Sequence, residues 1–273
     1  MQEEIPENQT GQQYIKFDAV ARDVHLGWHM DHMEVATTLR DVLLHGGRLT
    51  VLTGAGVSAE SGIATFRQSG GLWETHRLED VATPEGFARN PRLVLDFYNA
   101  RRRQLHTVQP NPAHTALARL EEVLGERFTL ITQNIDDLHE RGGSRRVLHM
   151  HGEILKARCA GCAHVLHWPG DLTLADACPD CGGRLRPHVV WFGEVPFHLE
   201  EEIPGALEAE VFMAVGTSGS VYPAAGMVAE AKRRRRLTVE VNLEPSENTH
   251  LFDIRVLGPA GKTLPELVAV ITE

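Results

Sequence analysis

The sequence predicts an α/β protein with a Rossmann-like, doubly wound parallel sheet and a smaller inserted lobe that carries a zinc ribbon. Short apolar segments alternate with helical segments along the chain, which is typical of a parallel sheet covered by helices. The chain has 273 residues, and its four cysteines lie close together. This length is long for one domain and short for two independent ones, so it fits one body with an inserted lobe.

Five apolar segments are expected to form buried strands, because each is short and ends at a polar or glycine-rich cluster. They lie at residues 49–52, 128–132, 147–148, 211–215 and 237–241. In doubly wound sheets, ligands bind beyond the carboxyl ends of the strands. We therefore expect the five clusters to meet at one site.

One helix between these strands is predicted at both ends. Asn111 followed by Pro112 is typical of a helix N-terminus, and Gly125 is typical of a helix end. Its buried face is marked by apolar side chains at helical spacing: Leu117, Leu120 and Leu124.

Composition sets limits on partners and location. The formal net charge of −10 argues against stable nucleic-acid binding, which needs Lys and Arg to neutralise phosphates. No segment approaches the roughly 18 apolar residues of a membrane helix, and the polar first residues are no secretory signal. We therefore expect a cytoplasmic protein without membrane contact, with residues 1–25 as a flexible tail. The oligomeric state stays open, with a monomer favoured.

A basic run at residues 232–236 departs from this acidic average. We expect it to be a solvated helix end, because cations suit the negative end of the helix dipole. A partner-binding patch is the alternative.

The cysteines form two C-x2-C pairs separated by fifteen residues, which is the spacing of a structural zinc site: Cys159, Cys162, Cys178 and Cys181. Each pair folds into a tight turn that points two thiolates at one point. The resulting tetrahedron is closed to water, so we expect one structural zinc ion. Two disulfides are the alternative, which a cytosolic chain disfavours. A zinc ribbon also occurs in nucleic-acid binders, so it does not identify the function.

The cluster after the first strand has the form G-x-G-x-x-A, from Gly54 to Ala59. Glycine lets the backbone approach a pyrophosphate, and a following helix N-terminus supplies free N–H groups, so the pattern predicts a dinucleotide site. No clear acidic residue ends a second strand about 20 residues later, as a dehydrogenase requires. This absence argues against hydride transfer.

Together these clusters resemble the sirtuin family, from about residue 48 to the C-terminus. The resemblance to the bacterial CobB type of this family extends to residues 186–194. The matching motifs are Gly54–Ser58 with Gly62-Ile63 and Phe66-Arg67, Thr132–Asp136, His149–Gly152, the four cysteines, Gly216–Ser218 and Asn242–Glu244.

The resemblance implies an NAD-dependent protein-lysine deacylase. In this family the acyl oxygen of the substrate attacks the nicotinamide ribose, nicotinamide leaves, and a histidine base activates a ribose hydroxyl that takes up the acyl group as O-acyl-ADP-ribose. By motif the base is His151, whose imidazole has a pKa near working pH. His149 is the competing choice, because residues i and i+2 of a strand share a face. Asn134 and Asp136 complete the catalytic set by binding the nicotinamide carboxamide.

The resemblance also implies a division of the chain and of its site. The Rossmann-like core covers about residues 26–75, 112–151 and 187–273, a helical insertion covers 76–111, and the zinc module covers 152–186. The peptide groove is formed by Val189, Phe192 and Val221. The NAD-binding residues are Gly54, Ala55, Gly56, Ser58, Phe66, Arg67, Trp73, Gln133, Asn134, Ile135, Asp136, Gly216, Thr217, Ser218, Asn242, Leu243, Glu244 and Ala260.

Tyr98 and Arg101 bear on the acyl preference. They are three residues apart, so they share a helix face. A guanidinium paired with a phenol can bind the carboxylate of a succinyl or malonyl chain. The Y-x-x-R pattern is similar to sirtuins that remove acidic acyl groups, although Ser69 stands where that subgroup generally has alanine. The alternative is a core tyrosine and a solvated arginine.

Two other functions remain as alternatives to deacylation. The same ribosyl intermediate can pass to a protein nucleophile, which gives mono-ADP-ribosyl transfer. An NAD-sensing module with a zinc ribbon for partner contacts is the second alternative.

Overall fold

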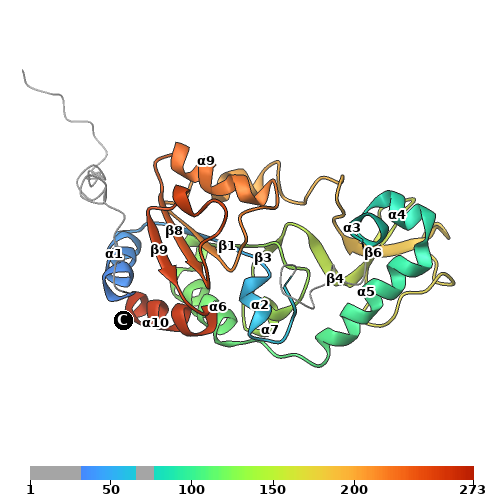
Figure 1. Cartoon of the computed structure of the whole chain (residues 1–273), viewed down its shortest axis with the longest axis horizontal. Helices are drawn as coiled ribbons and strands as arrows, with labels where there is room; N and C mark the ends of the chain where they lie inside the picture. Colours follow the sequence, from blue (N-terminus) through green and yellow to red (C-terminus); the bar gives the residue numbers. More distant parts are fainter. Residues whose placement is uncertain (1–31, 66–76) are drawn as a thin grey trace, which may run out of the picture.

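The computed structural model describes residues 32–65 and 77–273. Its larger part is built around a parallel sheet of six strands (Figure 1). The strand order is β3-β2-β1-β7-β8-β9, and every neighbouring pair is parallel. The five predicted strands are confirmed. The strands are β1 (Leu49–Thr53), β2 (Phe128–Thr132), β3 (Val147–His149), β7 (Val211–Val215), β8 (Leu237–Asn242) and β9 (Ile254–Leu257).

The edge strand β9 was not predicted from the sequence. The residues of β9 alternate between buried and exposed. In the central strands β1 and β7, by contrast, every residue is buried. An edge strand needs only one apolar face against the helices. A search for continuous apolar runs therefore passes over it.

The strand order places a topological switch point between β1 and β7. From β1 the chain builds outward through β2 and β3, and it then returns to the other side of β1 to add β7, β8 and β9. Helices cross on opposite faces on the two sides of such a point, which leaves a crevice at the carboxyl ends of the strands.

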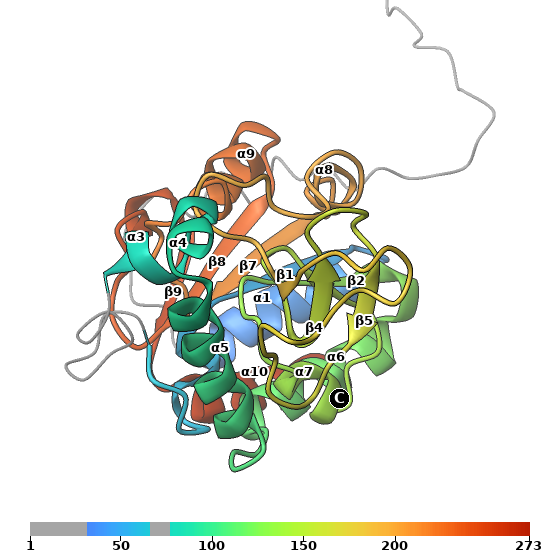
Figure 2. The ribbon, with the colours of Figure 1, turned by 90° about the vertical axis from the view of Figure 1, so that its right-hand side faces the viewer.

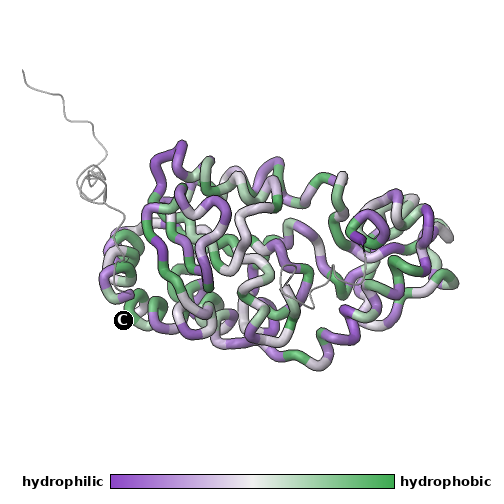
Figure 3. The backbone as a smooth tube through the Cα atoms, in the orientation of Figure 1, coloured by the Kyte–Doolittle hydropathy of each residue, from purple (hydrophilic) through white to green (hydrophobic). Residues whose placement is uncertain are grey.

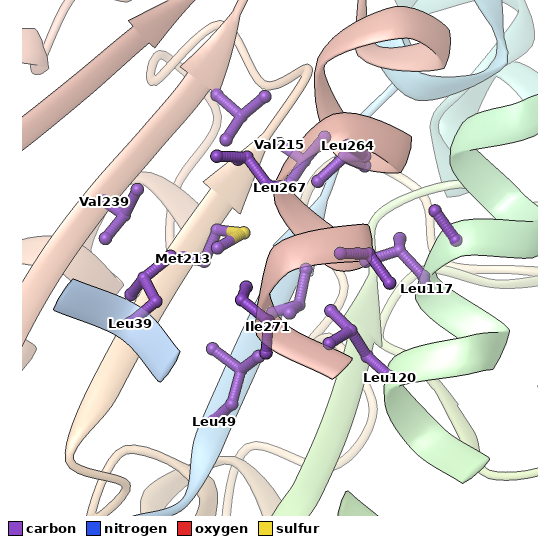
Figure 4. Packing of buried hydrophobic residues seen from close by; sticks show 14 of the residues in the cluster. Leu39, Leu49, Leu117, Leu120, Met213, Val215, Val239, Leu264, Leu267 and Ile271 are labelled. Carbon is purple, nitrogen blue, oxygen red and sulfur yellow. The ribbon is translucent and has the colours of Figure 1, made fainter. Parts of the chain in front are cut away.

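Three helices cover one face of the sheet: α1 (His32–Leu44), α6 (Pro112–Leu124) and α10 (Ala260–Thr272). Figure 4 shows Leu117 and Leu120 of α6 meeting Leu264, Leu267 and Ile271 of α10 above the strands. The other face is covered by α8 (Glu202–Ala206) and α9 (Met227–Arg233). The predicted N-cap is confirmed, since Asn111 accepts a hydrogen bond from the Ala113 N–H, and Gly125 ends α6 with φ +58°.

A smaller lobe lies beside the sheet and has its own apolar core (Figures 1 and 2). Its described residues form three helices and an antiparallel sheet in the order β5-β4-β6. The helices are α3 (Leu78–Val81), α4 (Pro84–Arg89) and α5 (Pro91–Leu105), and the strands are β4 (Gly152–Cys159), β5 (Val165–His167) and β6 (Leu185–Val189).

Short helical turns occur in the loops of the larger part: α2 (Gly56–Ala59), α7 (Leu138–Arg141), and the 3-10 turns Gly125–Arg127, Ala224–Gly226 and Thr249–Leu251. Within residues 32–65 and 77–273, no helix has the length and apolar character to cross a membrane.

The basic run at residues 232–236 lies at the hydrophilic outer end of α9 (Figure 3). Lys232 pairs with Asp253, Arg233 pairs with Glu230, and Arg236 pairs with Glu208. Neighbouring acidic groups of the same molecule therefore neutralise most of the run. This arrangement fits a helix end and gives no support to a partner-binding patch.

Replacing Leu117 by alanine should destabilise the fold. The Leu117 side chain is fully buried between the helices and the sheet, so its loss leaves a cavity and should cost about 2–5 kcal/mol of unfolding free energy. Val123→Ala on the same helix is the control, because Val123 is 41% exposed and should change stability by less than about 0.5 kcal/mol. Urea unfolding of both variants measures the difference, and equal costs would contradict the packing described.

Candidate active site

Glycine backbone brings two loops together at the switch point. The N–H of Gly54 donates to the Val215 carbonyl at 3.1 Å, and that of Gly56 donates to the Gly216 carbonyl at 2.8 Å. A Cβ on Gly56 would lie 2.7 Å from the Gly216 Cα, and Gly216 itself has φ +60°. Larger residues would force these loops apart. The helix that follows, α2, is only one turn long, so the loop backbone is the main feature of this cluster.

A buried hydroxyl joins the loop after β1 to the loop after β2. The Ser58 hydroxyl donates to the Asp136 carboxylate at 3.0 Å and accepts from the Asn134 side-chain amide at 3.0 Å. The other Asp136 oxygen accepts the Leu138 N–H at 3.1 Å. Burial raises the pKa of Asp136 to about 6, although the hydrogen bonds from Leu138 and Ser58 oppose this rise. The pKa of this carboxyl group therefore lies closer to neutral pH than that of an ordinary aspartate.

A second chain of hydrogen bonds connects three strand ends. The Gln133 side-chain amide donates to the Thr217 hydroxyl at 3.1 Å, and the Asn242 amide donates to the Thr217 carbonyl at 2.8 Å. The clusters after β2, β7 and β8 therefore meet at one edge of the sheet, as the sequence predicted. Of the remaining candidates, Ala55, Ile135 and Ser218 are half-buried, Leu243 and Glu244 are exposed, and Ala260 is buried at the start of α10.

The two candidate histidines differ in how their ring nitrogens are used. Both nitrogens of His149 have partners: Nδ1 meets the Asn134 carbonyl at 3.2 Å and Nε2 meets the Glu140 carboxylate at 2.7 Å. In His151, Nδ1 meets the Gln133 carbonyl at 3.0 Å, and Nε2 has no hydrogen-bond partner among the described residues. A carbonyl only accepts, so Nδ1 of His151 carries the proton and Nε2 presents its lone pair.

Opposite pKa shifts follow from these surroundings. Burial lowers the pKa of His151, and its bond to the Gln133 carbonyl only partly offsets this effect. Burial also acts to lower the pKa of His149, but the hydrogen bond and charge of Glu140 outweigh it and raise the pKa overall. The expectation that both histidines lie on one strand is wrong, because β3 ends at His149 and His151 lies in the turn before β4.

That turn connects His151 to the loop after β6. The Val190 N–H donates to the His151 carbonyl at 2.9 Å, and Val189 pairs with Gly152. Further along this loop, Phe192 is 48% exposed and its N–H donates to the Ala82 carbonyl at 3.0 Å. Of the candidate groove residues, Val189 is buried, Val221 is half-buried and Phe192 is exposed, so Phe192 offers the most surface to a peptide.

Comparison with known proteins identifies the family. The profile described as Sir2 family matches residues 54–223. The NAD-dependent protein deacylase of Salmonella typhimurium (strain LT2) is 57% identical over 230 residues, which cover 83% of this chain and 84% of the relative. The chain belongs to the Sir2 family.

Solved structures agree with this assignment. A Sir2 homologue in complex with NAD shares 38% identity with this sirtuin at a TM-score of 0.78, covering 90% of this chain and 96% of the homologue. Sir2Af2 bound to a myristoylated histone peptide shares 33% identity at a TM-score of 0.67, covering 87% and 96% of the two chains.

In this sirtuin the three consecutive arginines of α5 have different surroundings. Arg102 is fully buried and donates to the Ile154 carbonyl and to the Asn99 side chain, and exposed Arg103 pairs with Asp171. Half-buried Arg101 stacks over the Phe97 ring at 3.2 Å and donates from Nη1 to the Phe97 carbonyl at 2.6 Å. No carboxylate pairs with Arg101 in the described part of the chain.

Tyr98 is 5% exposed and lies in the apolar core of the lobe. Burial raises its pKa to about 12, against smaller opposing effects of the Trp191 hydrogen bond and the Arg101 charge. The alternative interpretation expected a core tyrosine and a solvated arginine. Tyr98 does lie in the core, but Arg101 is partly buried and not fully solvated. Sequence reasoning did not pick out Trp191 as a site residue. A buried tyrosine needs a polar partner, but nothing in the sequence says which residue that is.

The four cysteines of the lobe are positioned to bind a zinc ion. Their sulfur atoms all lie within 4.8 Å of one another, with Cys159 and Cys181 at 3.5 Å and Cys162 and Cys178 at 3.6 Å. A tetrahedron with Zn–S bonds of about 2.3 Å places sulfur atoms about 3.8 Å apart, whereas a disulfide needs about 2.0 Å. The geometry fits zinc and not two disulfides. Cys159 ends β4, so the ion would close the open end of the lobe sheet.

Four residues of the predicted site lie outside the described residues: Phe66, Arg67, Ser69 and Trp73.

Removal of the zinc ion should unfold the lobe and abolish enzymatic activity indirectly. The four ligands come from two separate turns that the ion would cross-link, so chelation or Cys159→Ser removes this constraint. Metal analysis, hydrogen exchange across residues 152–189 and activity should change together, and zinc added back to the chelated protein should restore all three. Full activity in metal-free protein would contradict a structural role for the ion.

Proposed function

We propose that this sirtuin is an NAD-dependent protein-lysine deacylase that acts on acyl-lysine side chains of protein substrates and releases nicotinamide and O-acyl-ADP-ribose. The curated relative at 57% identity is named for deacylation, and a solved homologue was bound to an acylated histone peptide. The observation that carries the proposal is His151, whose pKa is lowered and whose Nε2 has no partner in the described part of the chain.

His151 is the general base in this proposal. Its Nδ1–H is held by the Gln133 carbonyl, which fixes both the tautomer and the orientation of the ring. The pKa lowered by burial keeps the imidazole neutral at working pH, so Nε2 can take a proton from a hydroxyl. His149 lacks this capacity because Glu140 and the Asn134 carbonyl engage both of its nitrogens.

The loops at the switch point fit a dinucleotide. The side-chain oxygen of Asn134 has no partner in the described part of the chain, and Asp136 is a buried carboxyl beside it, so together they can hold a carboxamide. The close contact of Gly56 with Gly216 holds the loop after β1 against the loop after β7, where the phosphates would lie in this proposal. Thr217 and Asn242, which are hydrogen-bonded to each other, would contact the adenosine side. Bound NAD supplies the ADP-ribosyl group that accepts the acyl group from lysine.

We further propose that the enzyme removes succinyl and malonyl groups as well as acetyl groups. Arg101 is a half-buried cation without a carboxylate partner among the described residues, one helical turn from Tyr98. Burial lowers the pKa of Arg101 only to about 10, so it stays charged at neutral pH. An acidic acyl chain supplies the anion that this guanidinium lacks, and the release of Nη1 from the Phe97 carbonyl frees it to bind.

His151→Ala should nearly eliminate deacylation while NAD binding stays largely intact, because a general base acts on the rate and not on the ground state. Calorimetry of NAD binding and single-turnover assays separate the two effects. If His149→Ala silences the enzyme and His151→Ala does not, the base has been assigned to the wrong histidine.

The pH profile distinguishes the same two residues. The ordinary histidine pKa is 6.5; burial lowers that of His151, and Glu140 raises that of His149. With His151 as the base, kcat/KM should stay high through neutral pH and fall only below about pH 6.5. If kcat/KM already falls as the pH drops through values above 6.5, the base is His149, whose pKa is raised.

Arg101→Met should lower the ratio of desuccinylation to deacetylation. The loss of a charged hydrogen bond costs roughly 1.5–3 kcal/mol, or about 10- to 150-fold in the specificity constant for the acidic substrate. Arg103→Met is the matched control, because Arg103 is exposed and pairs with Asp171. Equal losses on both substrates would make Arg101 a structural residue and the enzyme a plain deacetylase.

A further inference from the structure

Trp191 donates its indole N–H to the Tyr98 hydroxyl at 3.0 Å. An indole N–H can only donate, so the phenol oxygen accepts this bond. The proton of Tyr98 is therefore left for another acceptor. No other hydrogen bond to this hydroxyl occurs in residues 32–65 and 77–273, so the structure leaves one unused donor in the apolar core of the lobe.

Two side chains pack against the indole, and a third binds the backbone of the same residue. The Arg186 guanidinium lies 3.3 Å from the centre of the Trp191 ring, and the Phe87 ring packs at 5.2 Å. The backbone N–H of Trp191 donates to the Glu194 carboxylate at 2.8 Å, and the same carboxylate binds Arg186. Trp191 is 2% exposed. The indole N–H is therefore held in one position, and the Tyr98 oxygen that accepts its hydrogen bond is held with it.

The backbone connects this pair to the proposed catalytic base. Trp191 follows Val190, whose N–H donates to the His151 carbonyl. On the other side, Tyr98 precedes Arg101 by one turn of α5, and the Arg101 charge acts on the Tyr98 hydroxyl. A lysine side chain that presents its acyl group to His151 therefore has Tyr98 and Arg101 in the adjacent lobe.

We propose that Trp191 is a positioning residue for acidic acyl groups: its N–H fixes the Tyr98 oxygen as an acceptor, which leaves the Tyr98 hydroxyl proton to bind the far carboxylate of a succinyl or malonyl chain. This inference rests on the acyl preference proposed above. Burial raises the Tyr98 pKa to about 12, so the hydroxyl keeps its proton across the working range. An acetyl group has no far carboxylate and gains nothing from this donor.

Trp191→Phe tests the inference, because phenylalanine keeps an aromatic ring against Phe87 and Arg186 but removes the N–H. The ratio of kcat/KM for succinyl-lysine peptide to kcat/KM for acetyl-lysine peptide should fall about three- to tenfold, the effect of one neutral hydrogen bond. The matched control is Trp168→Phe. Trp168 donates its N–H to the Asp171 carbonyl elsewhere in the lobe, and its loss should leave the ratio unchanged.

A double-mutant cycle separates positioning from packing. In a Tyr98→Phe background the hydroxyl is absent, so Trp191→Phe should lower the ratio no further. An equal fall in both backgrounds would overturn the inference, and so would an unchanged ratio in Trp191→Phe. If the phenylalanine variant fails to fold, replacement of Trp191 by its isostere β-(3-benzothienyl)alanine removes only the N–H and must give the same fall.

Failure of the proposed acyl preference gives a different result. In that case Arg101→Met leaves the ratio unchanged, or the wild type removes no succinyl groups, and the inference about Trp191 falls with it. If Arg101→Met lowers the ratio and neither Trp191 variant does, the acyl preference stands and Trp191 is a packing residue only.

Discussion

The site is organised around the hydroxyl of Ser58, which lies fully buried between Asp136 and Asn134. A buried carboxyl group is costly unless hydrogen bonds satisfy it, and Ser58 with the Leu138 N–H provides them. These bonds tie the loop after β1 to the loop after β2. They also set the position of Gln133, whose carbonyl holds His151 and whose side chain reaches Thr217. The positions of the candidate base and of the candidate nucleotide loops thus depend on the hydrogen bonds of the Ser58 hydroxyl.

The junction between sheet and lobe explains how a structural metal affects chemistry. His151 lies in the turn between β3 of the large sheet and β4 of the lobe sheet, and the Val190 N–H after β6 holds its carbonyl. The cysteines close the far end of the same lobe sheet. Arg102 adds a second tie, since its buried guanidinium binds the Ile154 carbonyl of β4. A lobe that loses its metal therefore loses the frame on one side of His151.

The sequence was sufficient for the features that repeat a local pattern. Continuous apolar runs located five strands, Asn111 and Gly125 marked the ends of α6, and the cysteine spacing predicted the thiolate cluster. The edge strand β9 was missed because its alternating side chains give no such run.

Features that depend on long-range contacts could not be predicted in this way. Motif reading favoured His151 over His149, but only the partners of their ring nitrogens give a physical reason. Likewise, the Y-x-x-R pattern indicated Tyr98 and Arg101 but not the Trp191 bond, which joins residues 93 positions apart in the sequence. Nor does the pattern say that Arg101 rests on Phe97 instead of pointing into solvent.

In the proposed function, this one site couples lysine deacylation to NAD cleavage. The most direct test incubates wild-type protein with NAD and an acetyl-lysine peptide and counts all products by mass spectrometry. We expect equal amounts of deacetylated peptide, nicotinamide and O-acetyl-ADP-ribose. Two results would contradict deacylation. If nicotinamide is released, ADP-ribose becomes attached to protein and the peptide stays acetylated, the enzyme is an ADP-ribosyltransferase. If NAD binds and no product forms, the protein is an NAD sensor.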